Sequence, residues 1–534
     1  MNHTAACSLA ASRLRALLDA VALGATAVSA ALAVSACAVG PNYRAPPPPA
    51  NHGYLPGALP AQTAAVGVAG GQAQHFDVGR DLPGDWWRLF GSSRLDALIE
   101  QAMMNYPDIA AQQAALRAAR EDVRAQRGVF LPQLQGRFDA TREKISGAAI
   151  APGLPQFITN VYQANVNVSY AFDLFGGQRR ALEGLQAQAL SQNFELEASY
   201  LTLTANVAAT AIQLASVRDQ IAATHSIIAL EQQQLSVVTR RFQLGSQTRA
   251  DVLQQQANLD AERATLPALR QQQAAAEHAL AVLTGRLPHD AAPPQLSLAD
   301  LTLPQQLPLS LPSSLVAQRP DIRAQAALVH QASAAIGVAT ANMLPQLTLT
   351  GSSFGAEALR LADLLEPGSN VWTLTGGLTQ PLFQGGALRA KRRAAIDAFE
   401  QAAAQYRLTV LRAFQGVADT LTALDNDADA LKAQADALDS AQASLDLIRK
   451  QYQIGAIDSV TLLSAQQAYQ QARLAYVRAL ASRYTDTVTL FQALGGGWWN
   501  RADPGALPAL RPKPAPRSEA ARRPDAGRSQ PDSQ

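Results

Sequence analysis

Cysteine is almost absent from this sequence, with two residues, Cys7 and Cys37, among 534. Arg13 and Arg15 precede a largely apolar run that closes in Val-Ser-Ala before Cys37, a pattern typical of a secretory signal with its cleavage site. Removal of residues 1–36 leaves a single thiol. This excludes a disulfide within the mature chain, so Cys37 needs another use.

Aromatic residues and net charge are also low. Phe, Trp and Tyr make up 6% of the chain, and the formal net charge is +2. With no large excess of basic residues, the net charge does not indicate nucleic acid as a partner. Alanine carries much of the 48% hydrophobic content, which favours thin, closely packed helices. No internal stretch looks apolar enough to predict a transmembrane helix.

Motifs for catalysis, metals and cofactors are missing. The seven histidines form no close pair with metal-ligand spacing. The Gly-Gly pair at 176–177 is followed by glutamine and not by the lysine of a phosphate loop, and no nucleophile elbow occurs. Asp425, Asp427 and Asp429 lack the glycine and terminal glutamate of a calcium loop, and we interpret them as a solvated helix face. The sequence predicts neither an enzyme nor a cofactor.

The sequence contains two copies of one unit. The tripeptide Pro-Asp-Ile at 107–109 recurs at 320–322, and Leu-Pro-Gln-Leu at 131–134 recurs at 344–347, both with an offset of 320 minus 107, or 213 residues. Further along the unit the offset becomes 210.

Each unit carries a long helical pattern with a core residue at every seventh position. Strict seven-residue spacing predicts supercoiled helices, and a helix from about 180 to 242 would be roughly 90 Å long. The two series are Val207, Leu214, Ile221, Ile228, Leu235 and Phe242, and then Val417, Leu424, Leu431, Leu438, Leu445 and Tyr452.

A glycine follows each series, Gly245 in the first unit and Gly455 in the second. Glycine suits the left-handed position that ends a helix, so we expect each long helix to turn back there and form a hairpin with a tight tip. The cap candidates of the two return helices are Thr248 or Asp251 and Asp458 or Ser459.

The other end of each unit changes to period two. Apolar and polar residues alternate over 134–141 and 162–172 in the first unit and over 372–379 in the second. One apolar and one polar face is the pattern of a transmembrane β-barrel. An ordinary sheet half exposed to water has the same pattern.

Four strands per chain imply self-association if the sheet lies in lipid. An open sheet would leave unsatisfied backbone groups at its edges, so copies must join and close. Two chains would give eight strands with a filled interior, and three would give twelve with a lumen. We infer a mostly α homotrimer, in which a 12-stranded β-barrel continues as a 12-helix α-barrel.

The order of the motifs resembles that of TolC-type outer-membrane efflux factors, in particular the NodT-like lipoproteins. The matching motifs are the lipobox-like VSAC ending at Cys37 with GPNY after it, DWWRLFGSSRLDALIEQAMMNYPDI at 85–109, both LPQL segments, DLFGG at 173–177, PLFQGG at 381–386, and the two hairpin tips.

The resemblance implies a passive trimeric duct that exports drugs or other toxic compounds. It implies a periplasmic adaptor protein and an inner-membrane efflux pump as partners, and a lipid on Cys37 that anchors the chain in the outer membrane. The chain then divides into a signal peptide at 1–36, a lipid-anchored proline-rich linker at 37–84, repeats at 85–300 and 301–499, and a disordered Pro- and Arg-rich tail at 500–534.

The resemblance also assigns roles to the tips. It implies adaptor docking by Phe242, Leu244, Gly245, Thr248, Tyr452, Ile454, Gly455 and Asp458. Asp251 and Tyr452 match a contact that closes the periplasmic end in some members, although Tyr452 also continues the heptad series as a core residue would. Acidic aperture residues and a tip arginine of some members have no counterpart, since Thr461, Ser464 and Ile457 occupy those positions.

Two other functions stay open. The chain has features expected of the outer-membrane duct of a type I protein secretion system, and of a structural coiled-coil lipoprotein. Strands with an apolar face favour a conduit over the structural role, and the lipobox with the NodT-like motif order favours small-molecule efflux over protein secretion.

Overall fold

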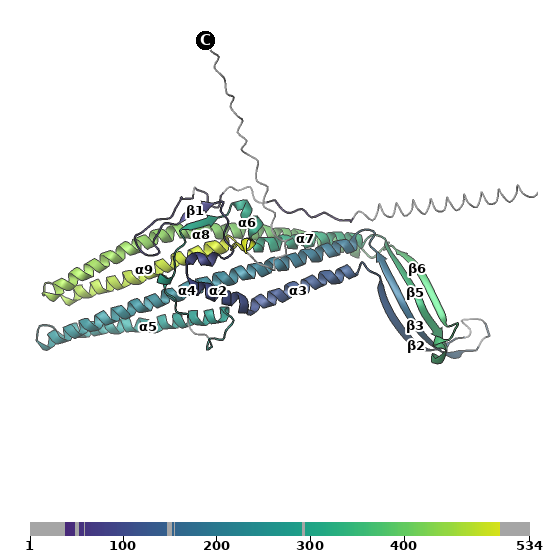
Figure 1. The fold of residues 1–534 in the computed structure, drawn as a ribbon, viewed down its shortest axis with the longest axis horizontal. Helices are drawn as coiled ribbons and strands as arrows, with labels where there is room; N and C mark the ends of the chain where they lie inside the picture. Colours follow the sequence, from purple (N-terminus) through teal and green to yellow (C-terminus); the bar gives the residue numbers. More distant parts are fainter. Residues whose placement is uncertain are drawn as a thin grey trace, which may run out of the picture.

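A computed structural model describes residues 38–47, 53–57, 59–146, 152–153, 155–290 and 294–501. The molecule is elongated, with long helices forming one arm and a four-stranded sheet projecting from the opposite end (Figure 1). Cys37 and the predicted tail beyond residue 501 lie outside the described residues.

The two repeats fold into the same order of elements. Repeat 1 contains α3 (Pro107–Gly128), β2 (Gln133–Ile145), β3 (Phe157–Phe172), α4 (Gly177–Gln243) and α5 (Arg249–Leu283). Repeat 2 contains α7 (Pro320–Ala341), β5 (Gln346–Ala358), β6 (Asn370–Thr379), α8 (Ala387–Gln453) and α9 (Ser459–Ala493). The long helices have 67 residues each and the return helices 35 each, and the 210-residue offset holds at both ends of these four helices.

Short elements gather around the middle of the helical arm. They are β1 (His75–Val78), α2 (Ser93–Asn105), β4 (Gln306–Leu309), α6 (Pro312–Gln318) and the 3-10 turns η1 (Trp86–Phe90), η3 (Leu298–Asp300) and η5 (Trp498–Asn500). Strands β1 and β4 pair in parallel and tie the segment before repeat 1 to the start of repeat 2. The remaining 3-10 turn, η4 (Leu361–Leu365), follows β5.

The heptad series form the core of the helical arm. Val207, Leu214, Val417 and Leu424 are fully buried, and each such side chain contributes roughly 1.5–3 kcal/mol through removal of apolar surface from water. Helix α4 lies against α5, α7 and α9, and α8 lies against α7 and α9. The long helices and return helices therefore lie side by side in the order α5, α4, α9, α8.

Helix α4 corrects one expectation from the sequence. It is the one helix among the described residues that is long and apolar enough to cross a membrane by composition, whereas we expected none. However, 61% of the apolar window is buried inside the molecule. The apolar residues of α4 are explained by its central place in the helical arm, where neighbouring helices cover it on several sides.

The segment expected to be an extended tether packs on the helical body where the structure describes it. Gly40, at φ 96°, lies so close to Gly337 that a Cβ on Gly40 would come within 2.5 Å of the Gly337 Cα. Arg180 Nη2 donates to Asn42 Oδ1 at 2.7 Å, and the Tyr43 ring stacks on His330 with centroids 4.2 Å apart. Proline content alone did not show these specific contacts.

Candidate membrane surface and hairpin tips

The four-stranded sheet has one apolar and one polar face across its whole width. Its order is β2-β3-β5-β6 with all neighbours antiparallel. Directly paired residues share a face, so the register places apolar residues beside apolar ones and polar residues beside polar ones. One apolar row is Leu134, Val168, Gly351 and Leu374, and the adjacent polar row is Gln135, Asn167, Ser352 and Thr373.

Large apolar side chains on the first face are exposed to the surroundings of the single chain. Phe138 is 58% exposed, Trp372 72% and Leu378 68%. Exposure of this apolar surface to water would cost about 25 cal/mol of free energy per Å². An exposed apolar face with aromatic residues is the pattern of the outward band that a transmembrane β-barrel presents to lipid.

The opposite face carries hydrogen-bonded charged side chains. Arg137 Nε donates to Asp139 at 2.6 Å, and Gln163 donates to Glu357 at 2.9 Å. A bulge in β5 between Ser352 and Gly355 shifts the register by one residue. Before the bulge, odd-numbered residues of β5 lie on the apolar face. After the bulge they lie on the polar face, so Glu357 pairs there with Gln163.

Both outer strands of the sheet have a free edge within one chain. Among the described strands, β2 pairs only with β3, and β6 only with β5. Backbone groups along such edges have no water to bind inside lipid. The single chain is therefore an incomplete barrel wall.

The hairpin tips are built alike in the two repeats. Gly245 and Gly455 have φ 78° and 77°, and no atom lies within 4 Å of a Cβ built on either. Ser246 N donates to Arg241 O and Ala456 N to Gln451 O, both at 2.9 Å, as in a Schellman motif. The glycines therefore end the long helices as the sequence predicted.

The return helices begin at side-chain caps. Thr248 and Asp251 form a capping box on α5, and the Asp458 carboxylate accepts from Thr461 N at 2.9 Å on α9. These hydrogen bonds lower the pKa of Asp251, chiefly through the Thr248 hydroxyl, and the pKa of Asp458, chiefly through the Thr461 hydroxyl. Thr248 and Asp458 are the N-caps, and Asp251 completes the first cap from the third position.

The two tips of one chain contact each other, in part through Arg241, which the sequence did not single out. Arg241 lies over the Tyr452 ring at 4.6 Å and donates to Gln453 O at 3.3 Å, at the C-terminal end of α8. Ser459 Oγ donates to Asp251 Oδ1 at 2.8 Å. A cation at a helix C-terminus is favourable, but nothing in the spacing of Arg241 indicated the contact.

The tip residues named from the sequence differ in exposure. Leu244 is 70% exposed, Ile454 81% and Phe242 42%, whereas Tyr452 is 3% exposed and packs with Leu445, Leu462 and Ala465. The Tyr452 hydroxyl has no hydrogen-bond partner in the described part of the chain, and the Asp251 carboxylate accepts from Thr248 and Ser459. The expected bond between Tyr452 and Asp251 is not formed within this chain, and their role in closure stays a prediction.

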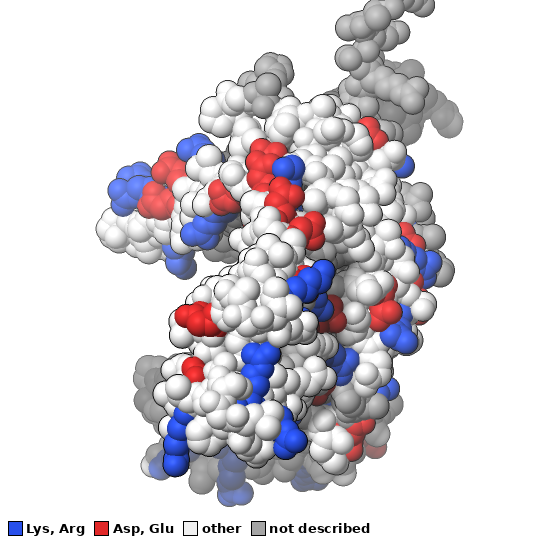
Figure 2. Space-filling view, turned by 90° about the vertical axis from the view of Figure 1, so that its left-hand side faces the viewer, with Lys and Arg blue, Asp and Glu red and all other residues white. Residues whose placement is uncertain are grey.

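The tip end of the molecule carries charges of both signs. Figure 2 looks at this end and shows basic and acidic side chains separated by broad uncharged areas. Arg240, Arg249 and Lys450 accompany Asp251 and Asp458 near the turns. A mixed surface with exposed apolar residues between the charges is suited to contact with another protein.

Carboxylates form one buried pair and one half-buried pair that the sequence did not reveal. Glu231 of α4 and Glu262 of α5 are 3% and 4% exposed, and one oxygen of each has no hydrogen-bond partner among the described residues. Burial, with repulsion from Glu262, raises the pKa of Glu231 to about 7. Asp427, expected on a solvated helix face, is half-buried and contacts Asp486, whose pKa is raised to about 7 by burial and by that contact.

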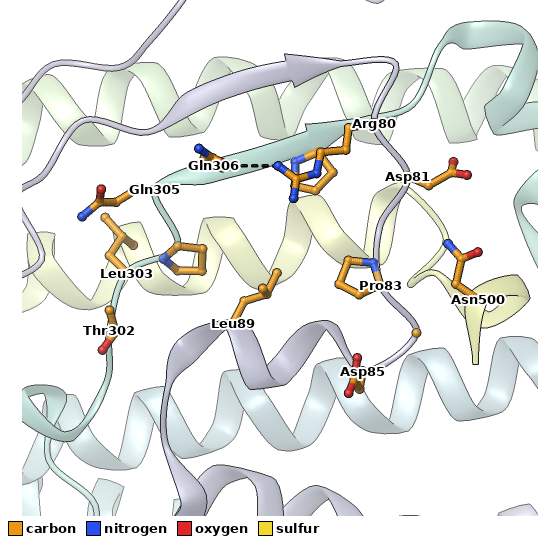
Figure 3. A pocket seen from close by; sticks show the side chains of 13 residues that line it. Arg80, Asp81, Pro83, Asp85, Leu89, Thr302, Leu303, Gln305, Gln306 and Asn500 are labelled. Carbon is orange, nitrogen blue, oxygen red and sulfur yellow. Dashed lines mark hydrogen bonds between the residues drawn. The ribbon is translucent and has the colours of Figure 1, made fainter. Parts of the chain in front are cut away.

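A groove of about 690 Å³ lies beside the β1–β4 pair (Figure 3). Arg80, on its rim, donates to Gln306 at 2.7 Å and to Asp77 at 3.1 Å. Asp81 accepts from Gln318 at 3.0 Å, and Asp85 forms an ion pair with Arg88. Its charged groups serve these local contacts, and the described residues contain no cluster of three or more metal-ligating side chains.

A two-faced sheet with free edges, continued by paired long helices, defines a channel-forming outer-membrane protein. The family model "Outer membrane efflux protein" matches residues 98–286 and 311–496, and the chain belongs to this family. Each matched segment lies within one of the two repeats. The protein is an outer-membrane efflux channel and not an enzyme.

Similar proteins cover most of the chain. The pyoverdine export outer membrane protein OpmQ of Pseudomonas putida is 32% identical over 80% of this chain and 92% of its own length. The toluene efflux pump outer membrane protein TtgF of P. putida is 29% identical over 89% of this chain and 96% of its own.

Solved structures show the same fold. The outer-membrane channel OprN matches with a TM-score of 0.77 and 25% identity, over 86% of this chain and all of OprN. The Campylobacter jejuni CmeC outer membrane channel matches with a TM-score of 0.78 at 21% identity, over 88% of this chain and 96% of CmeC. The architecture expected from the sequence, mostly helical with a β portion and built from two repeats, is confirmed.

Proposed function

We propose that three copies of this chain enclose a passive duct, through which small organic molecules delivered by an inner-membrane pump leave the cell. The observation that carries this proposal is the sheet, which has an apolar face, a polar face and two unpaired edges. The polar face would line a water-filled lumen and the apolar face would lie in lipid. Export of pyoverdine and toluene by relatives supports small molecules as the cargo.

The internal repeat supplies the geometry of assembly. Within the chain, β3 of repeat 1 pairs with β5 of repeat 2 in antiparallel fashion. If β6 pairs with β2 of the next chain in the equivalent way, every repeat is related to the next by one rotation. Six such repeats, from three chains, would form a closed twelve-stranded ring with a lumen and leave no free edge.

The helical arm favours the same arrangement. Among the described helices, α9 packs extensively against both α4 and α8, whereas α5 packs extensively only against α4. Leu463 on α9 is 9% exposed, but its counterpart Leu253 on α5, 210 residues earlier, is 58% exposed. Helix α8 of a neighbouring chain would cover Leu253 as the second neighbour of α5.

The hairpin tips are the proposed site for a periplasmic adaptor. Their exposed apolar side chains, Leu244 and Ile454, flank the bare glycine turns, where a partner helix can approach the backbone closely. The proposed docking set is the one named from the sequence: Phe242, Leu244, Gly245, Thr248, Tyr452, Ile454, Gly455 and Asp458. Of these, Tyr452 would act from the core beneath the turn.

Closure of the periplasmic end is proposed to involve Asp251 and Tyr452. Their direct bond would have to form in the closed trimer, because Ser459 and Thr248 occupy the Asp251 carboxylate within one chain. Tyr452→Phe tests this. A rise in passive entry of large antibiotics supports the bond, and unchanged entry in a trimer that still exports removes it.

A lipid on Cys37 is the proposed second attachment to the outer membrane. Ala38, the next residue, packs on Gly176, where a Cβ would lie 2.6 Å from the Ala38 Cα. Gly176 lies between the end of β3 and the start of α4, beside the end of the sheet that would meet the periplasm. A lipid attached one residue before Ala38 would therefore start near the membrane surface.

The function is tested by coexpression with a pump and adaptor of the resistance-nodulation-division class in cells that lack their own channel. Export of small hydrophobic dyes, lost when this chain is omitted, is the expected result. A duct of a type I system would instead release a protein cargo and leave dye export unchanged. A structural lipoprotein would support neither.

A further inference from the structure

Strand β2 carries two basic residues on its apolar face, at the end far from the helices. Residues Leu134, Phe138 and Ala140 point to this face, and the alternation places Arg142 and Lys144 on it too. Their paired residues on β3 are Asn160 and Ile158, also on the apolar side. A lipid-facing surface thus ends in two positive charges.

The height of these residues follows from the strand geometry. Phe172 and Tyr162 on β3 mark the two ends of the aromatic-flanked band. Their separation corresponds to about 33 Å along the strand at ~3.3 Å per residue, or about 25 Å across the membrane at a usual strand tilt. Tyr162 pairs with Ala140, so Arg142 and Lys144 stand about 5 and 10 Å beyond the band, by the same spacing.

No acidic side chain among the described residues forms an ion pair with either basic side chain. Both are exposed, and in the part of the chain that the structure describes neither forms an ion pair or side-chain hydrogen bond. Glu143, between them, alternates to the polar face. Glu357, another carboxylate of the sheet, is hydrogen-bonded to Gln163 on that same polar face.

We propose that Arg142 and Lys144 bind the phosphate groups of anionic lipid in the outer leaflet of the membrane. The inference rests on the proposed lipid-facing orientation of the sheet. A guanidinium matches a phosphate by paired hydrogen bonds, and an ammonium binds it as a point charge. Ile158, which is 59% exposed and opposite Lys144, adds an apolar contact that a lipid can use and a free phosphate ion cannot.

The test compares the full-length trimer with Arg142→Gln/Lys144→Gln and with a control. The control, Arg117→Gln/Arg120→Gln, also removes two exposed positive charges, but from α3, away from the sheet. Native mass spectrometry in detergent measures binding of diphosphoryl lipid A and of the same lipid without phosphates. A basic residue at a charged membrane surface contributes about 1 kcal/mol, so the double variant should bind about 30-fold more weakly, while the control should match the wild type.

Several results overturn the proposal. It is wrong if the double variant binds diphosphoryl lipid A as the wild type does, or if the dephosphorylated lipid binds equally well. A thermal shift with inorganic phosphate alone that equals the shift with lipid A assigns the site to free phosphate. If the double variant does not assemble, the two single variants are measured instead. Each is expected to bind about fivefold more weakly than the wild type. A sample that is not trimeric before lipid is added contradicts the proposed duct instead.

Discussion

Arg241 of α4 lies 4.6 Å from the centre of the Tyr452 ring of α8 and donates to the backbone carbonyl of Tyr452 at 3.4 Å. The contact joins the tips of the two repeats within one chain. Its counterpart between neighbouring chains would start from Gln451, 210 residues after Arg241, which is neutral. We therefore expect the tips of the two hairpins within one chain to be held together more firmly than the tips of neighbouring chains.

Replacement of Arg241 by alanine should loosen the tip. Loss of the cation–π contact and of the hydrogen bonds to the end of α8 costs about 1 kcal/mol, a roughly fivefold shift in the balance of tip conformations. We expect increased passive entry of large hydrophilic antibiotics, measured as growth sensitivity. Arg240→Ala is the matched control, since the one side-chain contact of Arg240 in the part of the chain that the structure describes is with Gln243, at 3.5 Å. Equal sensitivity of the two variants would rule out the tip contact as the cause.

Bulk at the tip glycines should block adaptor docking. Gly245→Trp with Gly455→Trp is expected to abolish export while trimers still reach the outer membrane. Both glycines have positive φ, so strain must be separated from bulk. Gly245→Asn with Gly455→Asn provides that control, because asparagine tolerates the left-handed region, and most export should remain. Normal export by the tryptophan variant would argue against docking at the tips.

Stability should fall as pH rises from about 5 to 8. The pKa of Glu231 is raised from 4.5 to about 7 in the folded state, so the folded chain holds a proton that the unfolded chain releases. Its stabilising effect is complete below the unfolded pKa and is lost as pH rises through the folded one, on the order of 3 kcal/mol. The melting temperature of the trimer, measured against pH, checks this.

Glu231→Gln with Glu262→Gln should flatten this pH profile. A smaller slope of the same sign should remain, because the pKa of Asp486 is also raised. Repeat 2 offers a natural comparison, since Ala441 and Ala472 stand 210 residues after the two glutamates. An unchanged profile in the double variant would show that the pair does not hold a proton near neutral pH.

Loss of Cys37 should separate the lipid anchor from the barrel. Cys37→Ser is expected to abolish metabolic labelling with palmitate and to leave insertion intact, because the apolar sheet face is a much larger attachment than one lipid group. Fractionation of labelled cells measures both properties. A wild-type chain that takes up no palmitate contradicts the anchor.

The sequence was sufficient for the features that repeat with a fixed period. Val207 and Val417 are each fully buried, as their heptad places required, and Leu134 and Leu374 lie on one apolar face, as their alternation required. Period and duplication are local properties of a chain, so they can be read without coordinates.

Contacts between distant segments were not accessible in the same way. The packing of Gly40 on Gly337 and of Arg241 on Tyr452 depends on how the two repeats meet in space. The pairing of Glu231 with Glu262 was hidden because glutamate is common on exposed helix faces. Of the candidate site, the turn glycines and caps followed from local chemistry, while the contacts between the tips did not.

The most direct test is the mass and the single-channel conductance of the purified full-length protein in detergent and planar bilayers. The account predicts a mass of three chains and a water-filled pore whose conductance falls when bulky residues replace side chains on the polar sheet face. A stable monomer in detergent, with no conductance in the bilayer, would contradict it.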